Sequence, residues 1–228
     1  MYLLKRRFRV IQGSLARGTE LLLVTSSTTC CDMGHGDARA VSVACGLGFE
    51  QHVRRLLGQR FRGPMAPGQV LITDAGAHPT ACHVAHVAVV DDREGIPLLH
   101  PGAPHRGART GLPSGRRLPD MERIAECYES LWLAIERIDE IGDISVGLGA
   151  LGAGVAELGV RLPTDLACRS LRDHLRRVRS SQIGDVTFYA YSLLELINMM
   201  EVVSTYFEVP PETVPRQVRR LVPRRHPS

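Results

Sequence analysis

Two loops of this sequence contain closely spaced glycines, and the first of them also carries side chains that could take up or release a proton. Residues 31–38 (CDMGHGDA) follow one buried apolar run, and residues 149–155 (GALGAGV) follow another. Glycines let backbone N–H groups approach phosphate oxygens, and the dipole of a following helix favours the negative charge. One such loop is a weak signal, because glycine also simply ends strands. Two of them, after separate strands of one sheet, indicate a diphosphate held between them.

Asp37 and His35 are the candidate catalytic residues of the first loop. Asp37 could orient an attacking water, and His35, which lies between two glycines, could bind substrate or act as an acid or base near neutral pH. A structural alternative exists for Asp37, since an acidic residue in the first turn of a helix stabilises that helix. The residues alone leave both interpretations of Asp37 open.

Six cysteines are spread through the chain without the spacing of a disulfide scaffold, and we expect reduced, mostly buried thiols. Cys30, Cys31, His35 and Cys45 fall in one region, which raises the question of zinc. The sequence has no CxxC pair, and Cys31 and His35 are not at a standard ligand spacing. We therefore expect neither a metal nor a cofactor.

Hydrophobic patterning predicts strands that alternate with helices. The predicted strands cover residues 6–12, 20–26, 69–73, 83–90, 143–148 and 185–191, and the predicted helices cover 37–57, 120–141, 162–178 and 193–207. Gly46 and Gly48 could break the first helix. This alternation predicts an α/β fold, a three-layer α/β/α sandwich with a mixed, mostly parallel sheet. Ligands of such sheets bind at the carboxyl ends of the strands.

Composition favours one soluble globular domain, with 44% apolar and 23% charged residues. We assign residues 1–208 to this domain, with a loop insertion at 93–118. Residues 209–228 form a Pro/Arg-rich tail, which could be a solvated terminus or could contact nucleic acid or an acidic partner. No apolar run approaches the roughly 20 residues that cross a bilayer. The first residues, MYLLKRRFRV, reverse the charge order of a secretory signal. We expect a cytoplasmic protein that does not contact membranes.

The order of these motifs over about residues 5–207, outside the 93–118 loop, resembles that of macro domains. Residues 12–15 (QGSL) stand where macro domains carry Gly-Asp-Ile, and 23–28 (LVTSST) resemble their Val-Asn-Ala-Ala-Asn segment. Residues 34–38 (GHGDA) resemble the glycine-rich first loop, and 150–154 (ALGAG) resemble the second loop. The resemblance implies a macro-like domain that holds ADP-ribose.

Several polar residues depart from the family pattern. Ser14 stands where an Asp hydrogen-bonds the adenine amino group, and Thr28 stands where the catalytic-type Asn falls. The Asp of hydrolytic members aligns with Ala38, although Asp37 is adjacent. Ala156 and Glu157 occupy positions where the second loop usually carries glycines, and a carboxylate there would repel a diphosphate.

The expected function is binding of ADP-ribose or a similar nucleotide, free or on an ADP-ribosylated protein or nucleic acid, with hydrolysis of ADP-ribose linkages as an enzymatic variant. The alternative is a non-catalytic protein or nucleic-acid interaction module with a degenerate pocket. Tyr191, at the end of the last strand, could stack on a base. The expected ligand-binding residues are Ser14, Leu15, Thr28, Gly34, Gly36, Gly152, Ala153, Gly154, Val155, Ala156 and Tyr191.

Overall fold

The computed structural model describes residues 6–92, 119–154 and 158–209. The predicted loop insertion at 93–118 and residues 210–228 of the predicted tail lie outside the described residues, as do Val155, Ala156 and Glu157. Within the described ranges, no helix combines the length and the apolar character needed to cross a membrane.

The described strands form a six-stranded sheet in the order β1-β6-β5-β2-β4-β3. β3 runs antiparallel to β4, and every other neighbouring pair is parallel, which confirms the predicted mixed, mostly parallel sheet. The burial of β4 on both faces explains its continuous apolar sequence. The strands are β1 (Phe8–Gln12), β2 (Leu22–Thr28), β3 (Val70–Asp74), β4 (His83–Val90), β5 (Ile144–Leu148) and β6 (Ile183–Ala190).

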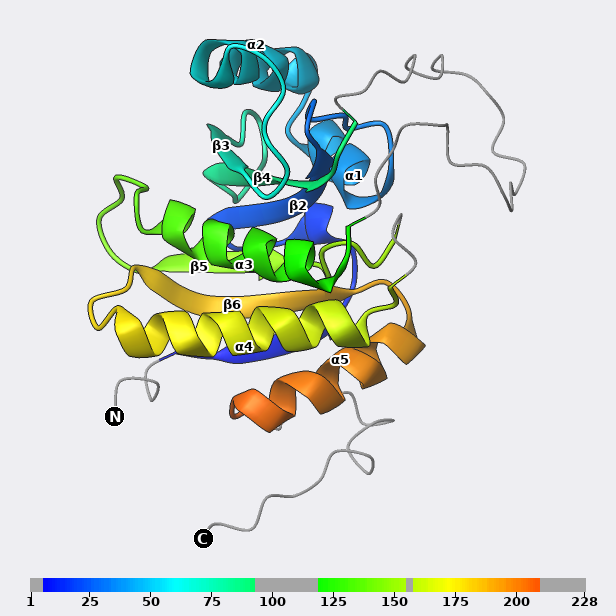
Figure 1. Ribbon diagram of the computed structural model, residues 1–228, viewed down its shortest axis with the longest axis vertical. Coiled ribbons are helices and arrows are strands. Elements are labelled where there is room, and N and C mark those ends of the chain that lie inside the picture. Colours follow the sequence, from blue (N-terminus) through cyan, green and yellow to red (C-terminus); the bar gives the residue numbers. More distant parts are fainter. Residues whose placement is uncertain (1–5, 93–118, 155–157, 210–228) are drawn as a thin grey trace, which may run out of the picture.

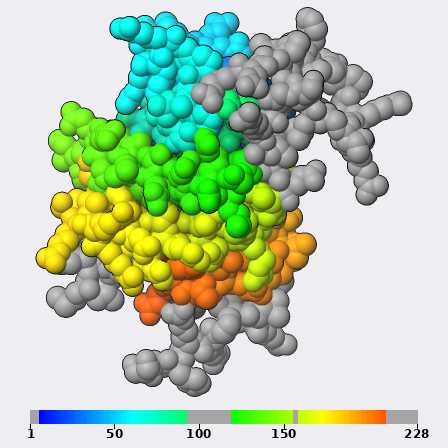
Figure 2. All heavy atoms as spheres, viewed as in Figure 1, coloured from blue at the N-terminus to red at the C-terminus, as the bar shows by residue number. Residues whose placement is uncertain are grey.

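Helices cover both faces of the sheet, which confirms the three-layer sandwich. One core cluster joins the sheet to α3 (Met121–Ile135), α4 (Arg161–Arg177) and α5 (Leu193–Tyr206). A second cluster joins the other face to α1 (Gly36–Ala44), α2 (Phe49–Phe61) and the short 3-10 helix η2 (Leu15–Arg17). α3 and α4 lie side by side across the strands (Figure 1). Their side chains form adjoining green and yellow bands on the face shown in Figure 2.

Two helices differ in extent from the sequence prediction. The helix predicted over 37–57 is two helices, and the break falls at the glycines expected to cause one. Gly48, the residue before α2, has φ 81°, a left-handed conformation that glycine adopts without strain. α3 ends at Ile135 rather than at 141. The prediction extended too far because Ile138, which follows the helix, is also apolar and buried and therefore continues the helical spacing of apolar residues.

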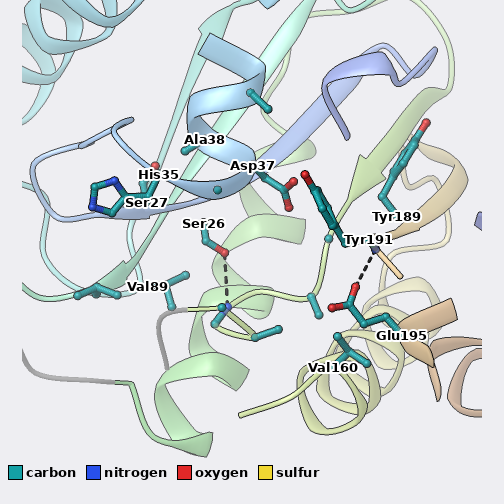
Figure 3. A pocket seen from close by; sticks show the side chains of 18 of the residues that line it. Ser26, Ser27, His35, Asp37, Ala38, Val89, Val160, Tyr189, Tyr191 and Glu195 are labelled. Atoms are coloured by element: carbon teal, nitrogen blue, oxygen red, sulfur yellow. Dashed lines mark hydrogen bonds between the residues drawn. The ribbon is translucent and has the colours of Figure 1, made fainter. Parts of the chain in front are cut away.

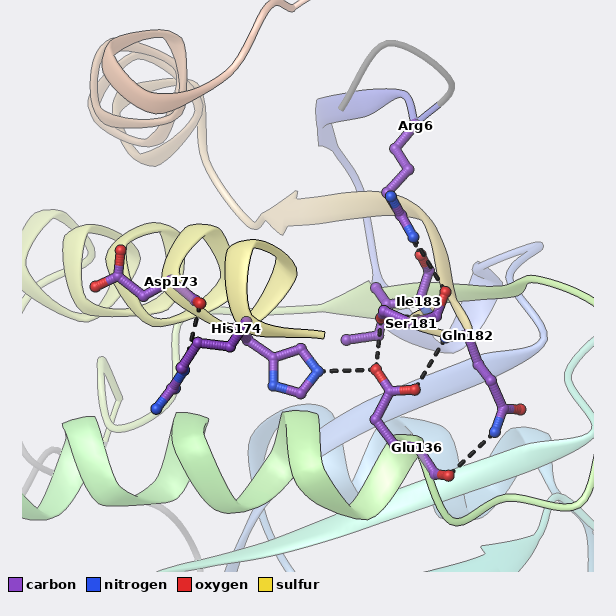
Figure 4. A network of polar contacts seen from close by, with 8 residues as sticks. Arg6, Glu136, Asp173, His174, Ser181, Gln182 and Ile183 are labelled. Carbon is purple, nitrogen blue, oxygen red and sulfur yellow. Dashed lines mark hydrogen bonds and ion pairs between the residues drawn. The ribbon is translucent and has the colours of Figure 1, made fainter. Parts of the chain in front are cut away.

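A polar network ties the end of α3 to α4 and to the segment that enters β6 (Figure 4). His174 Nε2 on α4 lies 2.8 Å from Glu136 Oε1, and the Gln182 N–H donates to Glu136 Oε2 at 2.9 Å. The Ser181 hydroxyl also donates to Glu136 Oε1. Burial would raise the pKa of the Glu136 carboxyl, but the hydrogen bonds from His174, Ser181 and Gln182 outweigh it and hold this pKa below its ordinary value.

We expect Glu136→Gln to lower the free energy of unfolding by about 1–3 kcal/mol at neutral pH, because it removes a charged hydrogen-bond acceptor from three donors. The contribution of the carboxylate is complete above its ordinary pKa of 4.5 and is lost as the pH falls through the lower folded-state pKa. Urea unfolding should therefore show a difference in the free energy of unfolding between the wild type and Glu136→Gln that is smaller at acidic pH than at neutral pH. Glu129→Gln, at an exposed position on the same helix, is the control and should change little. Equal losses in both variants would contradict the role of the network.

Candidate functional site

A cavity of about 490 Å³ lies along the carboxyl ends of the parallel strands. Both glycine-bearing loops border it, together with the ends of β1, β2, β4 and β6 and the first half of α5. Its lining residues are Gly13, Ser26, Ser27, Thr28, Asp32, His35, Gly36, Asp37, Ala38, Ala40, Val89, Val90, Gly149, Ala150, Gly152, Ala153, Gly154, Val160, Tyr189, Tyr191, Glu195 and Met199.

The first loop presents the beginning of α1 to this cavity. The helix starts at Gly36, and the preceding His35 makes no capping hydrogen bond through its side chain. The N–H groups in the first turn of a helix have no acceptor within the helix itself. Since Gly36, Asp37 and Ala38 line the cavity, this turn is suited to an anionic group of a ligand.

The second loop is held in place by hydrogen bonds from its own amides. The Leu151 N–H donates to the Tyr128 hydroxyl on α3 at 3.0 Å. The Gly152 N–H donates to Ser26 Oγ on β2 at 3.4 Å (Figure 3), and the Ala153 N–H donates to the Ala150 carbonyl at 3.1 Å. This loop therefore shapes one wall of the cavity, while three of its amides already have acceptors.

The Asp37 carboxylate reaches from α1 towards the second loop. A Cβ atom built on Gly149 would lie 3.0 Å from Asp37 Oδ2, so a side chain at this position would press against the carboxylate. Burial raises the pKa of Asp37, and the negative charge of Glu195 raises it further. The environment of Asp37 thus favours its protonated form more than water does.

Tyr191 and Glu195 form the wall contributed by β6 and α5 (Figure 3). The Tyr191 side chain is 78% exposed, so its ring is accessible to a ligand. Glu195 Oε2 accepts a hydrogen bond from the Tyr191 N–H at 2.7 Å, and the Glu195 N–H donates to Ser192 Oγ at 3.2 Å. These bonds resemble a capping box at the start of α5. The Tyr189 hydroxyl points away from the cavity, to Glu20 Oε2 at 2.8 Å.

Most of the residues predicted for the site do line this cavity, namely Thr28, His35, Gly36, Asp37, Gly152, Ala153, Gly154 and Tyr191. Thr28 also fixes the turn after β2, since its Oγ1 accepts from the amides of Cys30 and Asp32 at 3.3 and 3.2 Å. For these residues a role in ligand binding or catalysis stays a prediction.

Three predicted residues lie outside the lining. Ser14 precedes η2, Leu15 is buried in the core cluster on the α1 face, and Gly34 is exposed and donates its N–H to Asp32 Oδ1 at 2.9 Å. Val155 and Ala156 fall outside the described residues. Sequence reasoning missed Ser26 and Glu195, and it included Gly149 in the second loop without naming it as a ligand-binding residue. For Glu195 a signal was present, because Ser192 and Glu195 have the S-x-x-E spacing of a helix start.

The cysteines near the first loop are protonated thiols. Burial raises the pKa of Cys30 to about 11, with a further contribution from the charge of Asp92, and raises those of Cys31 and Cys45 to about 12. In the part of the chain that the structure describes, no three His, Cys, Asp or Glu side chains gather as metal ligands would.

Comparison with solved structures identifies the architecture. The Oceanobacillus iheyensis macrodomain with ADP matches 89% of this chain and 93% of its own, with a TM-score of 0.67 and 14% identity. A mutant of that macrodomain with ADPR gives a TM-score of 0.66, also at 14% identity, over 89% of this chain and 95% of its own. The fold is that of a macrodomain.

A third macrodomain, from Trypanosoma brucei and in complex with ADP-ribose, matches 87% of this chain and 69% of its own, with a TM-score of 0.62 and 15% identity. No protein-family model matches the sequence, and no curated protein matches it. The macrodomain fold has thus been kept here in a sequence that shares few residues with these structures.

The surroundings of Gly152 allow a test of how rigidly the second loop is positioned. Its φ of 81° disfavours any side chain, and a Cβ there would lie 2.7 Å from Ile124 Cδ1 in the core. We expect Gly152→Ala to lower the free energy of unfolding by about 1–3 kcal/mol, measured by urea denaturation. Gly154→Ala is the matched control, since no atom would lie within 4 Å of its Cβ. Equal stability of the two variants would contradict a rigidly positioned loop.

Proposed function

We propose that this macrodomain-fold protein binds ADP-ribose or a closely related nucleotide. The observation that carries the proposal is the cavity at the carboxyl ends of the strands, bordered by both glycine-bearing loops. Its volume of about 490 Å³ lies within the range of cavities that enclose small ligands. The macrodomain structures with ADP and ADP-ribose support a nucleotide as the ligand.

The walls of the cavity suit the separate parts of such a ligand. The uncapped first turn of α1 offers N–H groups and the positive end of its dipole to a diphosphate. The exposed ring of Tyr191 is available to stack on a base. Apolar walls come from Val89, Val90, Val160 and Met199, which exclude water from the bound ligand.

Calorimetric titration with ADP-ribose tests the proposal, with micromolar binding as the expected result. Tyr191→Ala should weaken this binding about tenfold, because stacking on an aromatic side chain contributes about 1–3 kcal/mol per base. Ile141→Ala is the control, since Ile141 is also an exposed apolar residue but precedes β5, at the end of the sheet opposite to the carboxyl ends of the parallel strands.

Absence of heat with ADP-ribose, confirmed by an unchanged melting temperature in its presence, would contradict the proposal. It would favour the alternative of a protein or nucleic-acid interaction module. Equal affinities of the Tyr191→Ala and Ile141→Ala variants would leave nucleotide binding in place but would remove Tyr191 from the base site.

Hydrolysis of an ADP-ribose linkage is the second candidate function. It is favoured by the raised pKa of Asp37, because carboxyl groups with perturbed pKa values in a cavity are candidates for proton transfer. His35 lines the same cavity and is the candidate partner. An ADP-ribosylated protein or nucleic acid would be the substrate of this activity.

We expect Asp37→Ala and His35→Ala each to slow release of ADP-ribose from a modified protein by at least about tenfold. Ile141→Ala serves again as the control. Release by the unaltered protein at a rate that neither substitution changes would exclude both residues from the reaction. No release above the uncatalysed rate would exclude the hydrolase.

The cytoplasm is the location that we propose for this protein. All six cysteines are free thiols, which is the usual state of cysteines in a reducing compartment.

A further inference from the structure

The charges around the cavity are unusual for a site that holds phosphates. Three carboxylates line it, those of Asp32, Asp37 and Glu195, and among the described residues no lysine or arginine does. His35 is the remaining basic side chain in the lining. Apart from His35, the donors that the described lining offers to an anion are therefore neutral: backbone N–H groups and the hydroxyl groups of Ser26, Ser27, Thr28 and Tyr191.

Asp37 and Glu195 act on the same part of the cavity. Asp37 Oδ2 lies between the first loop and the second, 3.0 Å from the position that a Cβ atom on Gly149 would take. Glu195 extends from α5, and a hydrogen bond from the Tyr191 N–H holds its carboxylate in place. The negative charge of Glu195 raises the pKa of Asp37. Figure 3 shows both carboxylates beside Tyr191, facing the interior of the cavity.

The dipole of α1 offsets these charges only in part. A helix N-terminus is equivalent to roughly half a positive charge, whereas two ionised carboxylates supply two negative ones. Each negative charge that a ligand adds is repelled by both carboxylates, and at partly buried separations this repulsion is not screened as it is in water. The repulsion therefore grows with the charge on the phosphates.

We propose that Asp37 and Glu195 make this cavity select nucleotides by charge, so that it binds best those with the fewest ionised phosphate oxygens. This inference rests on the proposed nucleotide binding. ADP-ribose satisfies the rule, because both of its phosphates are esterified or bridged and no terminal phosphate can ionise a second time. ADP has such a terminal phosphate, and ATP has a third phosphate in addition.

Other titratable groups face Asp37 from the elements around it. The first loop contributes Asp32 and His35, and the end of β6 contributes Tyr189 and Tyr191. Burial, followed by the hydrogen bond to Glu20, raises the pKa of Tyr189, so its phenol is neutral near neutral pH. The negative charge that raises the pKa of Asp37 is that of Glu195.

Titration calorimetry with ADP-ribose, ADP and ATP tests the proposal in the intact protein and in Asp37→Asn and Glu195→Gln. Both substitutions keep the volume of the side chain, and glutamine retains an oxygen that can accept from the Tyr191 N–H. At about pH 8, well above the ordinary pKa of a carboxyl group, we expect Asp37→Asn to tighten ATP binding about tenfold and ADP-ribose binding about threefold. Glu195→Gln should produce a smaller change in the same direction.

Two control variants separate charge selection from other effects. Asp139→Asn removes one exposed negative charge outside the cavity and should leave all three affinities unchanged. Tyr191→Ala should weaken the three nucleotides by similar factors, so that their ratios remain those of the wild type. A second signature is the pH dependence. As the pH falls through the raised pKa of Asp37, its protonation removes the repulsion, and wild-type affinities should approach those of Asp37→Asn.

The outcomes distinguish this inference from the proposed function. Nucleotide binding whose ADP-ribose to ATP ratio is the same in the wild type and in both amide variants overturns charge selection and leaves the proposed function intact. Failure of all three nucleotides to bind the wild type and the amide variants overturns both. Binding that appears only in the amide variants supports charge selection.

Discussion

Residues 22–24 of β2 lie in parallel register with 146–148 of β5, and the two strands consequently end at the same edge of the sheet. The loops that follow these strands therefore both lie at this edge, whatever their own sequences, although β2 continues to Thr28 beyond its last pair with β5. The cavity then needs only local features, a helix that begins at Gly36 and a turn that passes through Gly152. Long-range pairing of buried strands thus positions the site, and the glycines leave room within it.

The two loops are not equivalent, although both carry glycines. At the start of α1 the side chain of His35 makes no capping hydrogen bond, whereas amides of the second loop are bonded to Tyr128 and Ser26. A loop whose donors have protein acceptors gains rigidity, since each buried donor left unpaired would cost free energy. The second loop is therefore a fixed wall of the cavity, and the first turn of α1 is the part of the cavity to which we assign phosphate binding in our proposal.

The fold could be predicted from the sequence because its signals are local. Apolar runs such as 83–90 and the helical spacing of 121–135 each lie within one element, and parallel strands require helices between them. The glycine-bearing loops were recognised in the same way. The partners of those loops were not, because Ser26 and Gly152 are far apart in the sequence and no local pattern joins them.

Side-chain direction was the other limit of sequence reasoning. Leu15 lies in a segment next to the site, yet its side chain enters the core, since a 3-10 helix turns it towards α1 and away from the cavity. Glu195 shows the reverse case. Its spacing from Ser192 indicates only a helix start, and its place in the cavity becomes visible once α5 is packed against β6.

Backbone donors and buried carboxylates have a common consequence for recognition. Lysines and arginines attract any phosphate over a long range, whereas N–H groups bind only an oxygen that reaches them in the right geometry. In a cavity lined by Asp37 and Glu195, general attraction of anions is replaced by repulsion that a well-placed ligand must overcome. Under the charge selection that we propose, affinity depends on the fit of the whole ligand, and Tyr191 is the proposed contact of its base. Such a site would reject polyphosphates and accept a nucleotide whose phosphates are both internal to the molecule.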